Sequence, residues 1–152
     1  MPRRRTHIRA GVPAGAFAAA YRARDQTPAC LIMEAIGGGV GGWLGAQMPD
    51  GLEPASLGRN HRGFCHSWSA LLSGVAYTQA AISEWEQFCR QKADEVALRR
   101  ISNSEQTDWD RCLLSIQEMA WRIAAGILAG IVAGYVSHLA LDACTPSQLP
   151  YL

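Results

Sequence analysis

The chain has 152 residues, 49% of them hydrophobic, and a formal net charge of +1 at pH 7, so its length fits one domain with its own core better than two. The near-neutral charge disfavours a nucleic-acid partner, because such proteins usually carry a basic surface. Five cysteines without a CxxC pair favour neither a disulfide framework nor a zinc ribbon. We therefore expect a single domain over residues 1–152.

Hydrophobic periodicity predicts an all-α protein, an up-down bundle of about four helices, without a convincing alternating strand. The first helix is expected over about residues 6–24, with Thr6 as its N-cap. The second is expected over about residues 28–47. It should end before the sequence MPDGLEP, because two prolines and a glycine break a helix there.

The second half of the chain predicts two longer helices. The third should start near Gly63 and becomes more polar along its length. A polar connection from 99 to 108 follows, and the fourth helix should start near Asp108 and stop at Pro146. Residues 83–111 are therefore interpreted as a polar helical hairpin, at which a protein partner could dock.

Stripes of small residues predict that the first, second and fourth helices pack closely. Small residues at every fourth position let helix backbones approach each other, a device that is frequent in membranes. A spanning helix needs roughly 20 predominantly apolar residues, and Glu34 interrupts the second helix. We expect contact with membrane lipid, with a tightly packed soluble bundle as the alternative. The stripes are Gly11, Gly15 and Ala19; Gly37, Gly41 and Gly45; and Gly126, Gly130 and Gly134.

Helix order predicts that candidate metal ligands meet at one end of the bundle. In an up-down bundle the starts of the first and third helices share one end with the ends of the second and fourth. His138 and Asp142 are four residues apart and share a helix face. Imidazole and carboxylate ligands suit a divalent cation such as Zn, Mn or Fe. This end would gather His7, Asp50, Glu53, His61, His66, His138 and Asp142.

Other roles stay open for these residues at this point. A histidine near a helix end is often a cap or a surface residue, and Asp50 before a glycine is typical of a turn. Arg62, in the segment RNHRGFCHSWS, is either a solvated loop charge or a group that binds an anionic substrate. The residues alone thus allow a catalytic metal, a structural metal or no metal.

Four motifs together resemble the YdjM-like family of membrane-associated, metal-dependent hydrolases. They are Thr6-His7, PDGLEP at 49–54, GRNHRGFCHS at 58–67 and GYVSHLALDACTP at 134–146. The chain departs from the family pattern at Glu53, where a second Asp is common, and at Cys65, where Thr is usual. The resemblance implies that the metal is held by His7, Asp50, His61, His66, His138 and Asp142.

The resemblance and the residue chemistry predict a membrane-associated hydrolase that acts on a phosphoester or lipid-like substrate through a metal-activated water. Asp50 or Glu53 would be the general base, and Arg62 would stabilise developing negative charge. The alternative is a non-catalytic membrane-associated adaptor or subunit with a structural metal. Arg3 to Arg5 predict that the site faces the cytoplasm at a bacterial inner membrane, with a cytoplasmic protein as the alternative.

Overall fold

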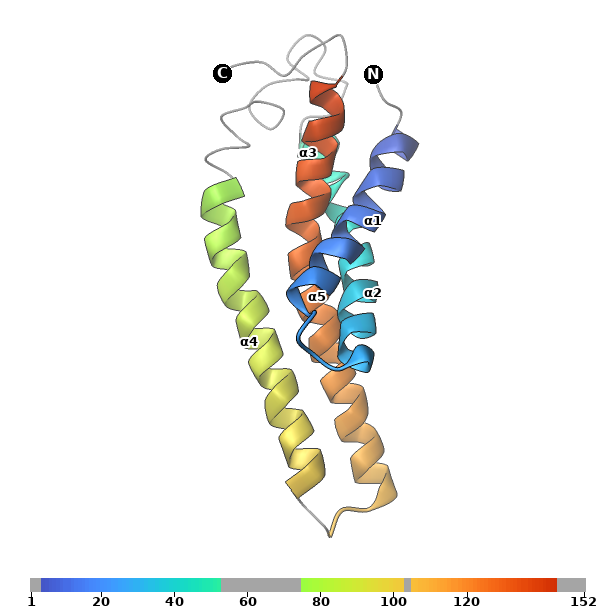
Figure 1. Cartoon of the computed structure of the whole chain (residues 1–152), viewed down its shortest axis with the longest axis vertical. Coiled ribbons are helices and arrows are strands. Elements are labelled where there is room, and N and C mark those ends of the chain that lie inside the picture. Colours follow the sequence, from blue (N-terminus) through green and yellow to red (C-terminus); the bar gives the residue numbers. More distant parts are fainter. Residues whose placement is uncertain (1–3, 53–74, 103–104, 145–152) are drawn as a thin grey trace.

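The computed structural model describes residues 4–52, 75–102 and 105–144, and it forms an all-α bundle. The long helices run up and down in turn, and the short α3 follows α2 (Figure 1). The predicted up-down bundle of about four helices is therefore confirmed, and none of the described residues forms a strand. The helices are α1 (Arg4–Arg22), α2 (Pro28–Gly45), α3 (Met48–Leu52), α4 (Val75–Ser102) and α5 (Asp108–Ala143).

One end of the bundle gathers the helix ends that the chain order predicts. Helices α1 and α4 begin there, and α2 and α5 end there (Figure 1). At the opposite end α1 turns tightly into α2, whereas α4 and α5 continue well past that turn. We call these two ends the site end and the hairpin end.

The first helix begins earlier than predicted, whereas the second begins at Pro28 as predicted. Helix α1 begins at Arg4, so Thr6 lies inside the helix and does not cap it. Thr27 caps α2 by accepting a hydrogen bond from the backbone N–H of Cys30. Pro28 then occupies the start of the helix, where its missing N–H has no helical partner to lose.

Helix α3 corrects the expectation that MPDGLEP only ends a helix. Met48–Leu52 form a short helix of their own. Pro49 is accommodated because it lies in the first turn, where backbone N–H groups have no partner within the helix. This helix keeps Asp50 at the site end.

Helices α4 and α5 extend beyond the rest of the bundle at the hairpin end. Helix α5 begins at Asp108 as predicted, after a reciprocal capping box between Thr107 and Asp110. Helix α4 reaches Ser102, so the expected polar connection begins later than predicted. The predicted start of this helix near Gly63 lies outside the described residues.

Backbone contacts through glycine form the centre of the bundle. A Cβ atom on Gly41 would overlap the backbone carbonyl of Ile127, and one on Gly130 would overlap that of Gly38. The buried positions of α1, α2 and α5 are mostly glycine or alanine, so these three helices touch main chain to main chain. The predicted small-residue stripes are therefore the contact surfaces between these helices.

Two segments are long and apolar enough to cross a membrane, Pro28–Leu52 and Asp108–Ala143. A glycine-rich interface leaves the large apolar side chains of these helices on the outside, and Ile32 and Ile36 are each 53% exposed. Small residues inside and large apolar residues outside are the arrangement expected for helices that pack within lipid.

Glu34, interpreted from the sequence as an interruption of the second helix, is buried and paired. Its carboxylate accepts hydrogen bonds from Arg90 Nη2 at 2.6 Å and Arg90 Nε at 3.0 Å. Arg122 Nη1 lies 3.4 Å from the other carboxylate oxygen. Two guanidinium groups thus offset the cost of burying this charge.

The pairs around Glu34 belong to a longer chain of charges, which we call the ion-pair network. Arg90 also pairs with Glu86 at 2.8 Å, Glu86 pairs with Arg22, and Arg122 pairs with Asp94. Three arginines alternate with three carboxylates, so the network is charge-balanced and ties α4 to α1, α2 and α5. Its members in order are Arg22, Glu86, Arg90, Glu34, Arg122 and Asp94.

Candidate metal centre

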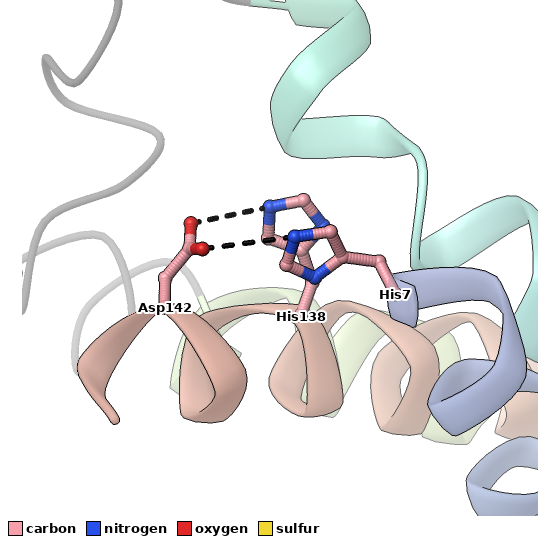
Figure 2. A group of neighbouring side chains, drawn as sticks. All are labelled: His7, His138 and Asp142. Atoms are coloured by element: carbon pink, nitrogen blue, oxygen red, sulfur yellow. Dashed lines mark ion pairs between the residues drawn. The ribbon is translucent and has the colours of Figure 1, made fainter. Parts of the chain in front are cut away.

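His7, His138 and Asp142 form a buried cluster at the site end (Figure 2). His7 comes from the beginning of α1, and the other two come from the end of α5. His138 Nε2 lies 3.4 Å from Asp142 Oδ2, and His7 Nε2 lies 3.7 Å from Asp142 Oδ1. One ligand atom from each residue lies within 4.8 Å of the others, so the group can hold a metal ion.

The two imidazole rings lie face to face. Their centroids are 3.7 Å apart and their planes are inclined by 15°. His138 is fully buried, and His7 is 3% exposed. Both rings turn Nε2 toward the carboxylate of Asp142, so the stack presents two imidazole nitrogen atoms to the same carboxylate.

The backbone of α2 orients His138. The Nδ1 atom of His138 lies 2.7 Å from the carbonyl oxygen of Ala46. A carbonyl only accepts hydrogen bonds, so Nδ1 donates, and in the neutral ring Nε2 carries the lone pair. A backbone carbonyl in this role is typical of metal-binding histidines.

Sequence reasoning missed Ala46, because its contribution comes from the main chain. Ala46 is the C-cap of α2, and the last carbonyl groups of a helix have no partner within that helix. One signal could have suggested this contact: the helix order places the end of α2, with its unpaired carbonyl groups, at the same end of the bundle as His138.

Asp50 adds a second carboxylate beside His138. Its Oδ1 atom lies 3.7 Å from His138 Nε2, and its side chain is 37% exposed. The Nε2 atom of His138 thus faces the carboxylates of both Asp50 and Asp142. A lone pair so placed is repelled unless a cation or a proton lies between the groups. Two imidazoles and two carboxylates are a donor set that fits Zn, Mn or Fe.

Gly42 fixes the distance between the two helices that carry the histidines. Its backbone lies against Gly11, one turn after His7, and against Gly134, one turn before His138. A side chain at any of these three glycines would separate α1, α2 and α5 near the cluster. The glycine contacts therefore bring the two rings together.

The structure thus brings His7, Asp50, His138 and Asp142 together, as the helix order predicts. The other predicted site residues lie outside the described residues, and their positions stay predictions from the sequence. They are Glu53, His61, Arg62 and His66.

The whole chain, residues 1–152, matches the family model described as YdjM inner membrane protein. This match includes the section of about 82–122, which the four sequence motifs do not cover. No curated protein and no solved structure matches the chain.

Proposed function

The chain belongs to the YdjM inner membrane protein family, and from this premise we propose that it is a metal-dependent hydrolase that cleaves a phosphoester at the membrane. The observation that carries the proposal is the buried cluster of His7, His138 and Asp142. Two histidines and one carboxylate are a ligand set of catalytic zinc sites, in which a further position stays open for water.

The residues of the cluster have separate roles in this proposal. The cation would be held by His7, His138 and Asp142. The hydrogen bond to the Ala46 carbonyl would fix the orientation of the His138 ring. A bound divalent cation supplies Lewis acidity and lowers the pKa of a water molecule. Asp50 is partly exposed and adjoins the cluster, so it would act as general base or as a further ligand.

Hydrolysis would consume one water molecule. Its oxygen bonds to phosphorus while the bond from phosphorus to the alcohol oxygen breaks, and the proton accepted by Asp50 passes to the departing alkoxide. Glu53 keeps its predicted role as the alternative general base, and Arg62 keeps its predicted role in stabilising negative charge. Both residues lie outside the described residues.

Metal binding is expected to depend on the cluster. His138→Ala or Asp142→Asn should lower the affinity for Zn by more than about 10–100-fold, the usual cost of losing only an orienting partner of a ligand. Metal per chain would be measured by mass spectrometry on protein purified without a metal-binding tag. Asp25→Asn is the matched control, because this carboxylate lies in the turn between α1 and α2 with its side chain 83% exposed. A parent protein that stays empty after incubation with Zn, Mn and Fe would contradict the proposal.

Asp50→Asn should separate catalysis from metal binding. If Asp50 is the base, this variant keeps the metal and hydrolyses a chromogenic phosphodiester at least about 100-fold more slowly, the lower range for loss of an acid or base. If Asp50 is instead a ligand, metal content and activity fall together.

The adaptor alternative predicts a bound metal without hydrolysis. Its support is the apolar surface of the hairpin end, where Ile101 is 77% exposed and Trp109 69% exposed. Under this alternative the residues 83–111 would bind a protein partner. A metal-loaded protein that cleaves neither phosphodiesters nor phospholipids would favour the adaptor over the hydrolase.

We also propose that the site end faces the cytoplasm. Cys144 follows α5 at the site end, and Cys112 lies on α5 toward the hairpin end; both are exposed. In spheroplasts, a membrane-impermeant maleimide should label a variant that retains only Cys112 and spare a variant that retains only Cys144. The reverse pattern would place the site on the periplasmic side.

A further inference from the structure

An exposed apolar stripe runs along α2 and continues onto α3. Its members recur at every fourth position, and each is between 40% and 62% exposed. The opposite face of α2 is buried and mostly glycine. The stripe therefore points away from the bundle, and we call it the apolar stripe: Ile32, Ile36, Val40, Leu44, Met48 and Leu52.

The apolar stripe ends at the candidate metal centre. Asp50 lies on α3 between Met48 and Leu52, the last two members of the stripe. The carboxylate of Asp50 lies 3.7 Å from His138 Nε2. The end of the stripe thus lies on the same short helix as a carboxylate that adjoins the cluster.

Exposed arginines indicate the depth of this end in a bilayer. Arg5 and Arg9 are exposed on either side of His7 in the sequence. Arginine near the end of a spanning helix is typical of the headgroup level. The ten residue steps from Val40 to Asp50 rise roughly 15 Å as helix, which is about half of a 30 Å hydrocarbon core. The segment from Val40 to Asp50 therefore matches the depth of one leaflet.

We infer that the substrate of the proposed hydrolase is a membrane phospholipid that reaches the centre from the bilayer. One acyl chain would lie on Val40, Leu44, Met48 and Leu52, and the phosphoester of the headgroup would lie beside Asp50 and the cluster. This inference rests on the proposed function, because it names the substrate of the proposed hydrolase. The cations Arg5 and Arg9 would favour an anionic headgroup.

A binding experiment tests the inference without using turnover. The probe is a non-hydrolysable phosphonate analogue of a phospholipid, with a photoreactive diazirine on one acyl chain, added to the metal-loaded protein in nanodiscs. Adducts should concentrate between Val40 and Leu52 and should fall when unlabelled phosphonate analogue is added. Labelling that is spread evenly over all exposed apolar faces, including Trp85 of α4, and that resists competition would overturn the inference.

A kinetic experiment separates this inference from the proposed function. Met48→Gln with Leu52→Gln should lower kcat/KM for a long-chain phospholipid, relative to a soluble phosphodiester, by about tenfold, since two apolar contacts with the chain are lost. Ile32→Gln with Ile36→Gln is the matched control at the far part of the stripe, and it should leave this ratio unchanged. Metal content checks that both variants fold. If the parent cleaves the soluble ester and the ratio does not change, lipid access is wrong; if the metal-loaded parent cleaves no ester, the hydrolase proposal itself fails.

Discussion

Gly41→Ala should destabilise the bundle by at least about 3 kcal/mol, the upper range for overpacking a well-packed core. The added Cβ would overlap the carbonyl oxygen of Ile127 and lie 2.9 Å from both the carbonyl carbon of Ile127 and the backbone nitrogen of Ile131. These atoms belong to the main chain of α5, so no side-chain rotation can relieve the overlap. Thermal unfolding in one detergent, followed by far-UV circular dichroism, measures the effect.

Gly39→Ala is the matched control on the same helix. A Cβ there would meet only Val12 Cγ1 at 3.7 Å and Ala16 Cβ at 4.0 Å, which are ordinary contacts. Alanine also favours a helix over glycine by about 0.5–1 kcal/mol, so this variant should be as stable as the parent or more stable. Equal stability of the two variants would mean that α2 and α5 do not touch through Gly41.

The same glycines show how far the sequence could predict the packing. A repeat of four predicts a smooth helix face, and Gly37, Gly41 and Gly45 do face α5. The sequence did not indicate that Gly38 and Gly42 form a second such face toward α1. Spacing identifies the faces of a helix, but it does not say which neighbour each face meets. That choice depends on tertiary contacts.

The candidate site was predictable to the extent that it depends on local spacing and helix order. His138 and Asp142 share a face because they are four residues apart, and His7 reaches them because α1 begins where α5 ends. The orienting carbonyl of Ala46 belongs to the main chain, so its residue type gives no sign of it. The partners of Glu34 are 56 and 88 residues away, so no local pattern pairs them with it.

Glu34→Gln should destabilise the fold by about 3–5 kcal/mol, the usual cost of removing one partner from a buried ion pair. The neutral amide has nearly the same shape, but it leaves Arg90 and Arg122 with one carboxylate fewer. Arg122 is only 3% exposed, so water cannot replace the lost charge. Glu95→Gln is the control, because Glu95 forms an exposed pair with Lys92, and its loss should leave the unfolding temperature almost unchanged.

A double variant distinguishes charge balance from hydrogen-bond geometry as the source of this stability. Glu34→Leu with Arg90→Met removes one charge of each sign and leaves the pairs Arg22 with Glu86 and Arg122 with Asp94. Buried ion pairs replaced by apolar residues of similar volume often cost little or nothing, so the double variant should unfold at a higher temperature than Glu34→Gln. If the double variant is the less stable of the two, then α4 is held by the geometry of these hydrogen bonds and not by charge balance. If the double variant instead unfolds at the higher temperature, the cost of Glu34→Gln comes from unpaired charge. Glu34 is then tolerated in an apolar helix because α4 and α5 each contribute an arginine that pairs with it.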